Sequence, residues 1–174
     1  MNPTWLPTLC TVLNLGAGTA SLLLTVNGHY RLALIWIAMA AVFDVLDGLL
    51  ARLLHCTSEF GKQLDSLADL ISFGAAPAML VLLYQLDDDR WLGPAAVILF
   101  VICGALRLAR FNISGSINGF TGLPITAAGT LLALSSLSGP DLPSYWTIIL
   151  MAVMSLLMIS RIPFPAFKNK MVRK

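Results

Sequence analysis

The sequence is poor in charged residues. Of its 174 residues, only 11% are Asp, Glu, Lys or Arg, whereas 57% are hydrophobic. Soluble globular domains carry about 25% charged residues, and a water-soluble core of this length could not bury so much apolar surface. The mean hydropathy of +0.82 indicates the same. We therefore expect an integral membrane protein, with the lipid bilayer as its solvent.

The chain also lacks the residue patterns of several common reactive sites. Its three cysteines, Cys10, Cys56 and Cys103, have no metal-ligand spacing, and we expect them to pack as small apolar residues. No Ser-His or Cys-His pair suggests a covalent intermediate. The net charge of +2 favours no particular charged partner, and we expect no nucleic-acid binding. The first apolar stretch has no basic segment before it and no clear cleavage site, so it is expected to stay as a membrane helix.

Long apolar runs fill most of the chain. Each has roughly the 17–25 residues that a helix needs to cross the hydrocarbon layer, and turn-forming residues separate them. The six expected spans are Leu6–Val26, Leu32–Leu54, Leu64–Tyr84, Leu92–Leu108, Phe120–Leu137 and Tyr145–Ile162. No hydrophilic linker divides the chain. The prediction is an all-α, polytopic membrane protein with six transmembrane helices in a single domain over residues 1–174.

The basic residues predict the orientation of these helices. If the N-terminus is cytoplasmic, only Arg31 and Arg90 fall on the outer side. The other nine then lie on the cytoplasmic side: Arg52, Lys62, Arg107, Arg110, Arg161, Lys168, Lys170, Arg173 and Lys174. This asymmetry satisfies the positive-inside rule. We expect both termini on the cytoplasmic side of the cytoplasmic membrane, with the last basic run in contact with anionic lipid headgroups.

Four aspartates lie close together in the second and third predicted helices. Asp44 and Asp47 share a face of the second helix with Gly48, Ala51 and Arg52, at spacings of three or four residues. Asp65 and Asp69 follow Gly61 at intervals of four, on one face of the third. Because the connection between the helices is short, the two faces are expected to meet near the cytoplasmic end.

Four carboxylates in an apolar environment need a partner. One Asp at the centre of a membrane helix costs about 2.5–3.5 kcal/mol on insertion scales, and one Arg cannot neutralise four acids. A divalent cation with oxygen ligands, Mg²⁺ or Mn²⁺, is the simplest solution, and such ions leave coordination positions for substrate phosphates. From the residues alone, two explanations stay open: metal-assisted catalysis and ion or proton transport. The small residues Gly48 and Ala51 either leave room for a nucleotide or allow close helix packing.

The complete pattern resembles a known signature. Asp44-x2-Asp47-Gly48-x2-Ala51-Arg52-x8-Gly61-x3-Asp65-x3-Asp69 is similar, at all eight defined positions, to that of the CDP-alcohol phosphatidyltransferase family. The resemblance implies six membrane helices, a homodimer, a cytoplasmic-side active site and one or two Mg²⁺ or Mn²⁺ ions.

The resemblance also implies roles for individual residues. Asp44, Asp47, Asp65 and Asp69 correspond to metal ligands, and Asp69 also to the general base. Contacts to the CDP group are expected from Gly48, Ala51, Arg52, Ser58, Thr8 and Thr11. Thr8 departs from the family pattern, in which an Asn is common at this position.

Three further runs resemble the phosphatidylserine synthase branch: 64–78, 106–112 and 120–124. This resemblance implies transfer of a phosphatidyl group from CDP-diacylglycerol to L-serine, giving phosphatidylserine and CMP. The serine carboxylate is expected to meet Arg107 and Arg110, although both also fit a role as positive-inside anchors. Glycerol 3-phosphate or inositol phosphate as acceptor, an ether-lipid donor, and a cation or proton transporter are the alternatives.

Overall fold

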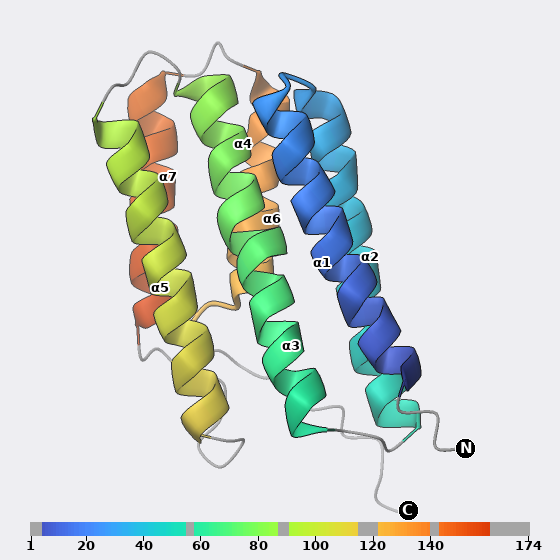
Figure 1. Cartoon of the computed structure of the whole chain (residues 1–174). Helices are drawn as coiled ribbons and strands as arrows, with labels where there is room; N and C mark the ends of the chain where they lie inside the picture. The colour runs from blue at the N-terminus through green and yellow to red at the C-terminus, as the bar shows by residue number, and fades with distance from the viewer. Residues whose placement is uncertain (1–4, 55–57, 87–90, 115–121, 140–142, 161–174) are drawn as a thin grey trace, which may run out of the picture.

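The computed structural model describes residues 5–54, 58–86, 91–114, 122–139 and 143–160. Within these ranges the regular elements are all helical. They are α1 (Trp5–Val26), α2 (Tyr30–Leu53), α3 (Glu59–Asp69), the π-helix η1 (Leu70–Ala75), α4 (Ala76–Gln85), α5 (Leu92–Ser114), α6 (Ile125–Ser135), the 3-10 turn η3 (Ser136–Ser138) and α7 (Ser144–Ile159). The helix axes are roughly aligned and form one bundle, with α3 and α4 in the middle (Figure 1).

Six helical runs are present in the described part of the chain, since α3, η1 and α4 form one continuous rod of residues 59–85. Four runs are long and apolar enough to cross a membrane: α1, α2, the 59–85 rod and α5. The run 125–138 and α7 are shorter apolar helices. The chain is therefore an all-α integral membrane protein, as the apolar segments predicted.

Several helix ends differ from the predicted ones. The third run begins at Glu59 rather than Leu64, because Ser58 caps it by accepting a hydrogen bond from the Gly61 N–H at 2.9 Å. Helix α5 continues past Leu108 to Ser114. Helix α6 begins at Ile125, because Pro124 takes an extended conformation and Gly122 has a positive φ of 83°. The predicted start at Phe120 and the basic residues from Arg161 onward lie outside the described residues.

Polar side chains tie the helices together inside the bundle. The Ser21 hydroxyl donates to the carbonyl of Ala33 at 2.9 Å, and the Tyr30 hydroxyl donates to that of Leu83 at 2.9 Å. Gln85 donates to the carbonyls of Ser135 and Gly139, both at 3.0 Å. These bonds satisfy groups that lipid cannot. They fix α1 to α2, α2 to α4, and α4 to the end of α6.

The π-helix lies directly after Asp69 and is packed tightly on two sides. On one side, Gly18 of α1 lies so close to Ser72 that an added Cβ would be 2.7 Å from the Ser72 Cα. On the other, a Cβ on Gly129 of α6 would be 2.7 Å from the Phe73 carbonyl carbon. The Ser72 hydroxyl also donates to the carbonyl of Asn14 at 3.0 Å. Single π turns often occur at functional sites, and this one holds the helix that carries Asp65 and Asp69.

Candidate metal centre and its two cavities

Three of the predicted carboxylates meet where α2 faces α3. One oxygen from each of Asp44, Asp47 and Asp65 lies within 4.8 Å of the other two. Asp44 and Asp47 are one turn apart on α2, and Asp65 comes from α3. The helical spacing that places the first pair on one face, and the packing of α3 beside it, bring the three together.

Asp69 lies next to this triad, at the last position of α3. It is only 8% exposed, and its side chain interacts with that of Asp44. Its Oδ1 atom is buried and has no hydrogen-bond partner among the described residues. Asp69 therefore lies at the edge of the triad, with its Oδ1 uncommitted.

These groups fit a divalent cation. Oxygen ligands at about 2.1 Å from one Mg²⁺ lie at most about 4.2 Å apart, a spacing comparable with the 4.8 Å within which the oxygens of the triad lie. The Oδ1 atom of Asp65, like that of Asp69, is buried and without a hydrogen-bond partner in the described chain. Buried carboxylate oxygens left unpaired are costly, and a cation is the partner that suits all of them.

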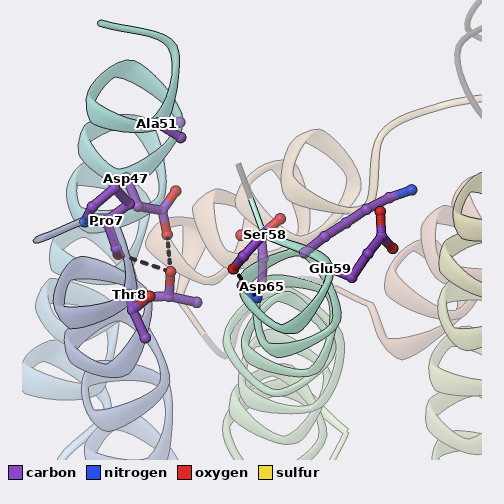
Figure 2. Close-up of a pocket in the computed structure, with 11 residues that line it drawn as sticks. Pro7, Thr8, Asp47, Ala51, Ser58, Glu59 and Asp65 are labelled. Atoms are coloured by element: carbon purple, nitrogen blue, oxygen red, sulfur yellow. Dashed lines mark hydrogen bonds between the residues drawn. The ribbon is translucent and has the colours of Figure 1, made fainter. Parts of the chain in front are cut away.

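Asp47 and Asp65 of the triad line a first cavity of about 320 Å³. Pro7, Thr8, Asp47 and Ala51 lie on one side of it, and Ser58, Glu59 and Asp65 on the other (Figure 2). Thr11, Gly48, Gly61 and Lys62 complete its lining. Five of the six residues predicted to contact CDP thus line the same cavity: Thr8, Thr11, Gly48, Ala51 and Ser58. The sixth, Arg52, does not line it.

A second cavity has a volume of about 480 Å³. It shares Asp47, Gly48, Lys62 and Asp65 with the first, so the two cavities adjoin at these residues. Its other polar lining comes from Asp44, Arg52, Ser66, Asp69, Arg107, Asn112 and Thr126. All four aspartates thus line the second cavity, and Asp47 and Asp65 line the first as well.

The two arginines of α5 have different surroundings. Arg107 lines the second cavity, is 9% exposed, and has a buried Nε without a hydrogen-bond partner among the described residues. Arg110 is exposed and donates to the carbonyl of Ile159 on α7 at 3.2 Å. It is not part of the lining of the cavity. The structure thus places Arg107 at the site and uses Arg110 to hold α5 against α7.

Thr11 supports the triad from α1. Its hydroxyl oxygen lies 2.8 Å from Asp47 Oδ2 and 3.0 Å from the Pro7 carbonyl oxygen. A hydroxyl has one proton to donate, and the carboxylate is the stronger acceptor. The sequence predicts that Thr11 contacts the nucleotide. In the structure, its hydroxyl fixes the orientation of Asp47.

Several residues of the site were not predicted. Lys62 and Glu59 line the first cavity, and Asn112 and Ser66 line the second. Lys62 directly follows Gly61 of the aspartate pattern, and this position is a sequence signal that it lies at the site. The meeting of Asn112 and Ser66 depends on the packing of α5 against α3, which no spacing along the chain reveals.

Comparisons with known proteins identify the family of the chain. A sequence model of the CDP-alcohol phosphatidyltransferase family matches residues 4–162. The archaetidylserine synthase of Methanothermobacter thermautotrophicus is 41% identical over 166 residues, which cover 92% of this chain and 69% of that protein. The CDP-diacylglycerol–serine O-phosphatidyltransferase of Bacillus subtilis is 34% identical over 170 residues, covering 95% and 92%. The enzyme of the same name from Methanocaldococcus jannaschii is 41% identical over 161 residues, covering 92% and 73%. The chain belongs to the CDP-alcohol phosphatidyltransferase family.

Proposed function

We propose that this protein transfers the phosphatidyl group of CDP-diacylglycerol to the hydroxyl of L-serine, with phosphatidylserine and CMP as products. The observation that carries the proposal is a cluster of four aspartates that all line one cavity, while Asp47 and Asp65 also line a second cavity beside it. A nucleotide in the first cavity and a small acceptor in the second would both reach the acids. The names of relatives that are 34–41% identical over most of the chain support serine as the acceptor.

The donor is assigned to the first cavity. Thr8, Thr11 and Ser58 line it, and Gly48 and Ala51 leave space beside the backbone of α2. Arg52 lines the second cavity, from which its guanidinium would act on the phosphate side of the nucleotide rather than on the base. The acyl chains would lie against the apolar outer surface of the helices.

The metal ligands in this proposal are Asp44, Asp47 and Asp65, with Asp69 beside them, holding one or two Mg²⁺ or Mn²⁺ ions. When bound, such ions neutralise diphosphate charge and stabilise the charge that develops on transfer. The aspartates themselves fix the position of the diphosphate relative to the acceptor, and correct positioning is a large part of catalysis of phosphoryl transfer.

Asp69 is proposed as the general base. Its uncommitted oxygen would accept the proton of the serine hydroxyl, and the serine oxygen would then form a bond to the phosphorus that carries diacylglycerol. The bond from that phosphorus to the CMP oxygen breaks, and CMP leaves. Arg107 would bind the serine carboxylate, since it is a nearly buried cation at the same cavity. Arg110, which lies farther out, would add to the positive potential.

The orientation and assembly are also proposed. The described basic residues Arg52, Lys62, Arg107 and Arg110 lie on the helix segments that hold the site, whereas Arg31 lies at the opposite end, beside the start of α2. By the positive-inside rule, the site would face the cytoplasm, with both termini on that side. A homodimer is expected from the family resemblance.

An acceptor screen tests the proposal. The purified protein, in detergent with Mn²⁺ or Mg²⁺, is given CDP-diacylglycerol and one radiolabelled acceptor: serine, glycerol 3-phosphate or inositol phosphate. A parallel series uses an ether-linked CDP-lipid, because one matching relative is named an archaetidylserine synthase. Labelled lipid and CMP are expected with serine. Product with another acceptor alone, or ion flux in proteoliposomes without CMP release, contradicts the proposal.

A further inference from the structure

Asn112, near the end of α5, lies in the second cavity with Arg107 and Asp69. Its Nδ2 donates to the hydroxyl oxygen of Ser66 at 3.0 Å and to Gln63 Oε1 at 3.4 Å, both on α3. Its Oδ1 is buried and has no hydrogen-bond partner within the described ranges. The side chain is thus held on one side and left open on the other.

The contacts of Ser66 fix which way the amide points. The Ser66 hydroxyl donates its only proton to the carbonyl of Lys62 at 3.2 Å. Ser66 therefore presents a lone pair to Asn112, and only the amide nitrogen can use it. Gln63 Oε1, the second neighbour, is also an acceptor. The amide oxygen is consequently the atom that remains for another partner, and this partner has to be a donor.

The second cavity thus offers three different groups. Arg107 is a buried cation, Asp69 is an acid with one uncommitted oxygen, and Asn112 supplies a neutral acceptor. The diphosphate of a CDP-lipid is fully ionised at neutral pH and has no proton to donate to Asn112 Oδ1. The amino group of cytosine could donate, but Asn112 is not part of the first cavity, to which the nucleotide is assigned. An α-amino acid with a hydroxyl carries the complementary set: a carboxylate, an ammonium and a hydroxyl.

We propose that Asn112 binds the ammonium group of the acceptor through Oδ1 and thereby selects an amino-acid alcohol over alcohols without an amine. Ser66 is the positioning residue that keeps the amide oriented. This inference rests on the proposed transfer to serine and adds to it a determinant of specificity. Asn112 makes no contribution to metal binding in this account.

Two variants test the inference: Asn112→Leu, which removes the acceptor at similar volume, and Ser66→Ala, which removes the group that orients it. Each is assayed with serine and with 3-hydroxypropanoate, which lacks only the amine. For Asn112→Leu, we expect the KM for serine to rise about ten- to a hundredfold, as for a lost hydrogen bond to a charged group. The KM for CDP-diacylglycerol should stay unchanged, and the preference for serine over 3-hydroxypropanoate should fall by a similar factor. Ser66→Ala should also raise the KM for serine and lower the preference for serine, each by a smaller factor than Asn112→Leu.

Asn27→Leu is the matched control. Asn27 is exposed and directly follows α1, at the end of that helix away from the site, and among the described residues its side chain bonds only the Leu23 carbonyl. Melting temperatures in detergent verify that the variants fold. If the wild type uses serine and both variants keep its full preference for serine, the inference is wrong while the proposed function stands. If the wild type forms no product with serine, the proposed function fails, and the inference fails with it.

Discussion

Replacing Thr11 with valine would test whether α1 supports the acid triad. The substitution keeps the shape of the side chain and removes one hydroxyl. That hydroxyl lies 2.8 Å from Asp47 Oδ2, and both residues are buried. We expect Asp47 to lose its fixed orientation toward Asp44 and Asp65 and therefore to bind a cation less well.

The magnitude follows from the nature of the bond. Hydrogen bonds to a charged group are worth about 1.5–3 kcal/mol, which is about ten- to 150-fold at 1.36 kcal/mol per decade. Loss of a residue that orients a metal ligand typically lowers metal affinity about ten- to a hundredfold. The two ranges agree. Thr11→Val should therefore raise the Mn²⁺ or Mg²⁺ concentration needed for half-maximal CMP release at least about tenfold.

The assay is a titration of CMP release against metal concentration, with both substrates saturating. Thr11→Ser, which keeps the hydroxyl, should resemble the wild type. Thr19→Val is the matched control, because the Thr19 hydroxyl is exposed and bonds only the Leu15 carbonyl of its own helix. An unchanged metal requirement in Thr11→Val, with a raised KM for CDP-diacylglycerol instead, would show that Thr11 acts on the nucleotide and refute this reasoning.

Two further predictions concern the base and the helix packing. Asp69→Asn should lower turnover with serine at least about a hundredfold, the usual contribution of a general base, while the melting temperature is retained; normal turnover would remove Asp69 from that role. Gly129→Ala should destabilise the protein by about 1–3 kcal/mol or more, because its Cβ would overlap the backbone of Phe73. This change should appear as a lower melting temperature in detergent. Gly16→Ala, where a Cβ meets nothing within 4 Å, should be neutral or slightly stabilising, and equal effects of the two substitutions would contradict the packing described.

The part of the site that lies within single helices could be predicted from the sequence. Asp44 and Asp47 share a face because of the helical period, and Asp65 and Asp69 do so for the same reason. Their meeting followed from a short connection between two apolar helices. The high cost of charge in lipid makes a shared cation the natural partner of these acids.

The remaining features depend on packing between distant segments. Nothing in Leu70–Ala75 distinguishes a π turn from an α-helix, and the close approach of Gly18 and Gly129 to it is visible only in three dimensions. The apolar pattern predicts a fifth helix from Phe120, whereas Pro124 and the positive φ of Gly122 delay the start of α6 to Ile125. The spacing of Arg110 to Arg107 predicts a shared contact to the acceptor, whereas the Arg110 side chain bonds α7.

In the proposed mechanism, the four aspartates hold a divalent cation for transfer of a phosphatidyl group to serine. The most direct measurement is CMP release by the purified wild-type protein from CDP-diacylglycerol and serine, after treatment with EDTA and again after Mn²⁺ or Mg²⁺ is restored. We predict no CMP and no phosphatidylserine with EDTA, and equal amounts of both products when the metal is returned. CMP release that EDTA leaves unchanged, or that does not depend on serine, would contradict the account.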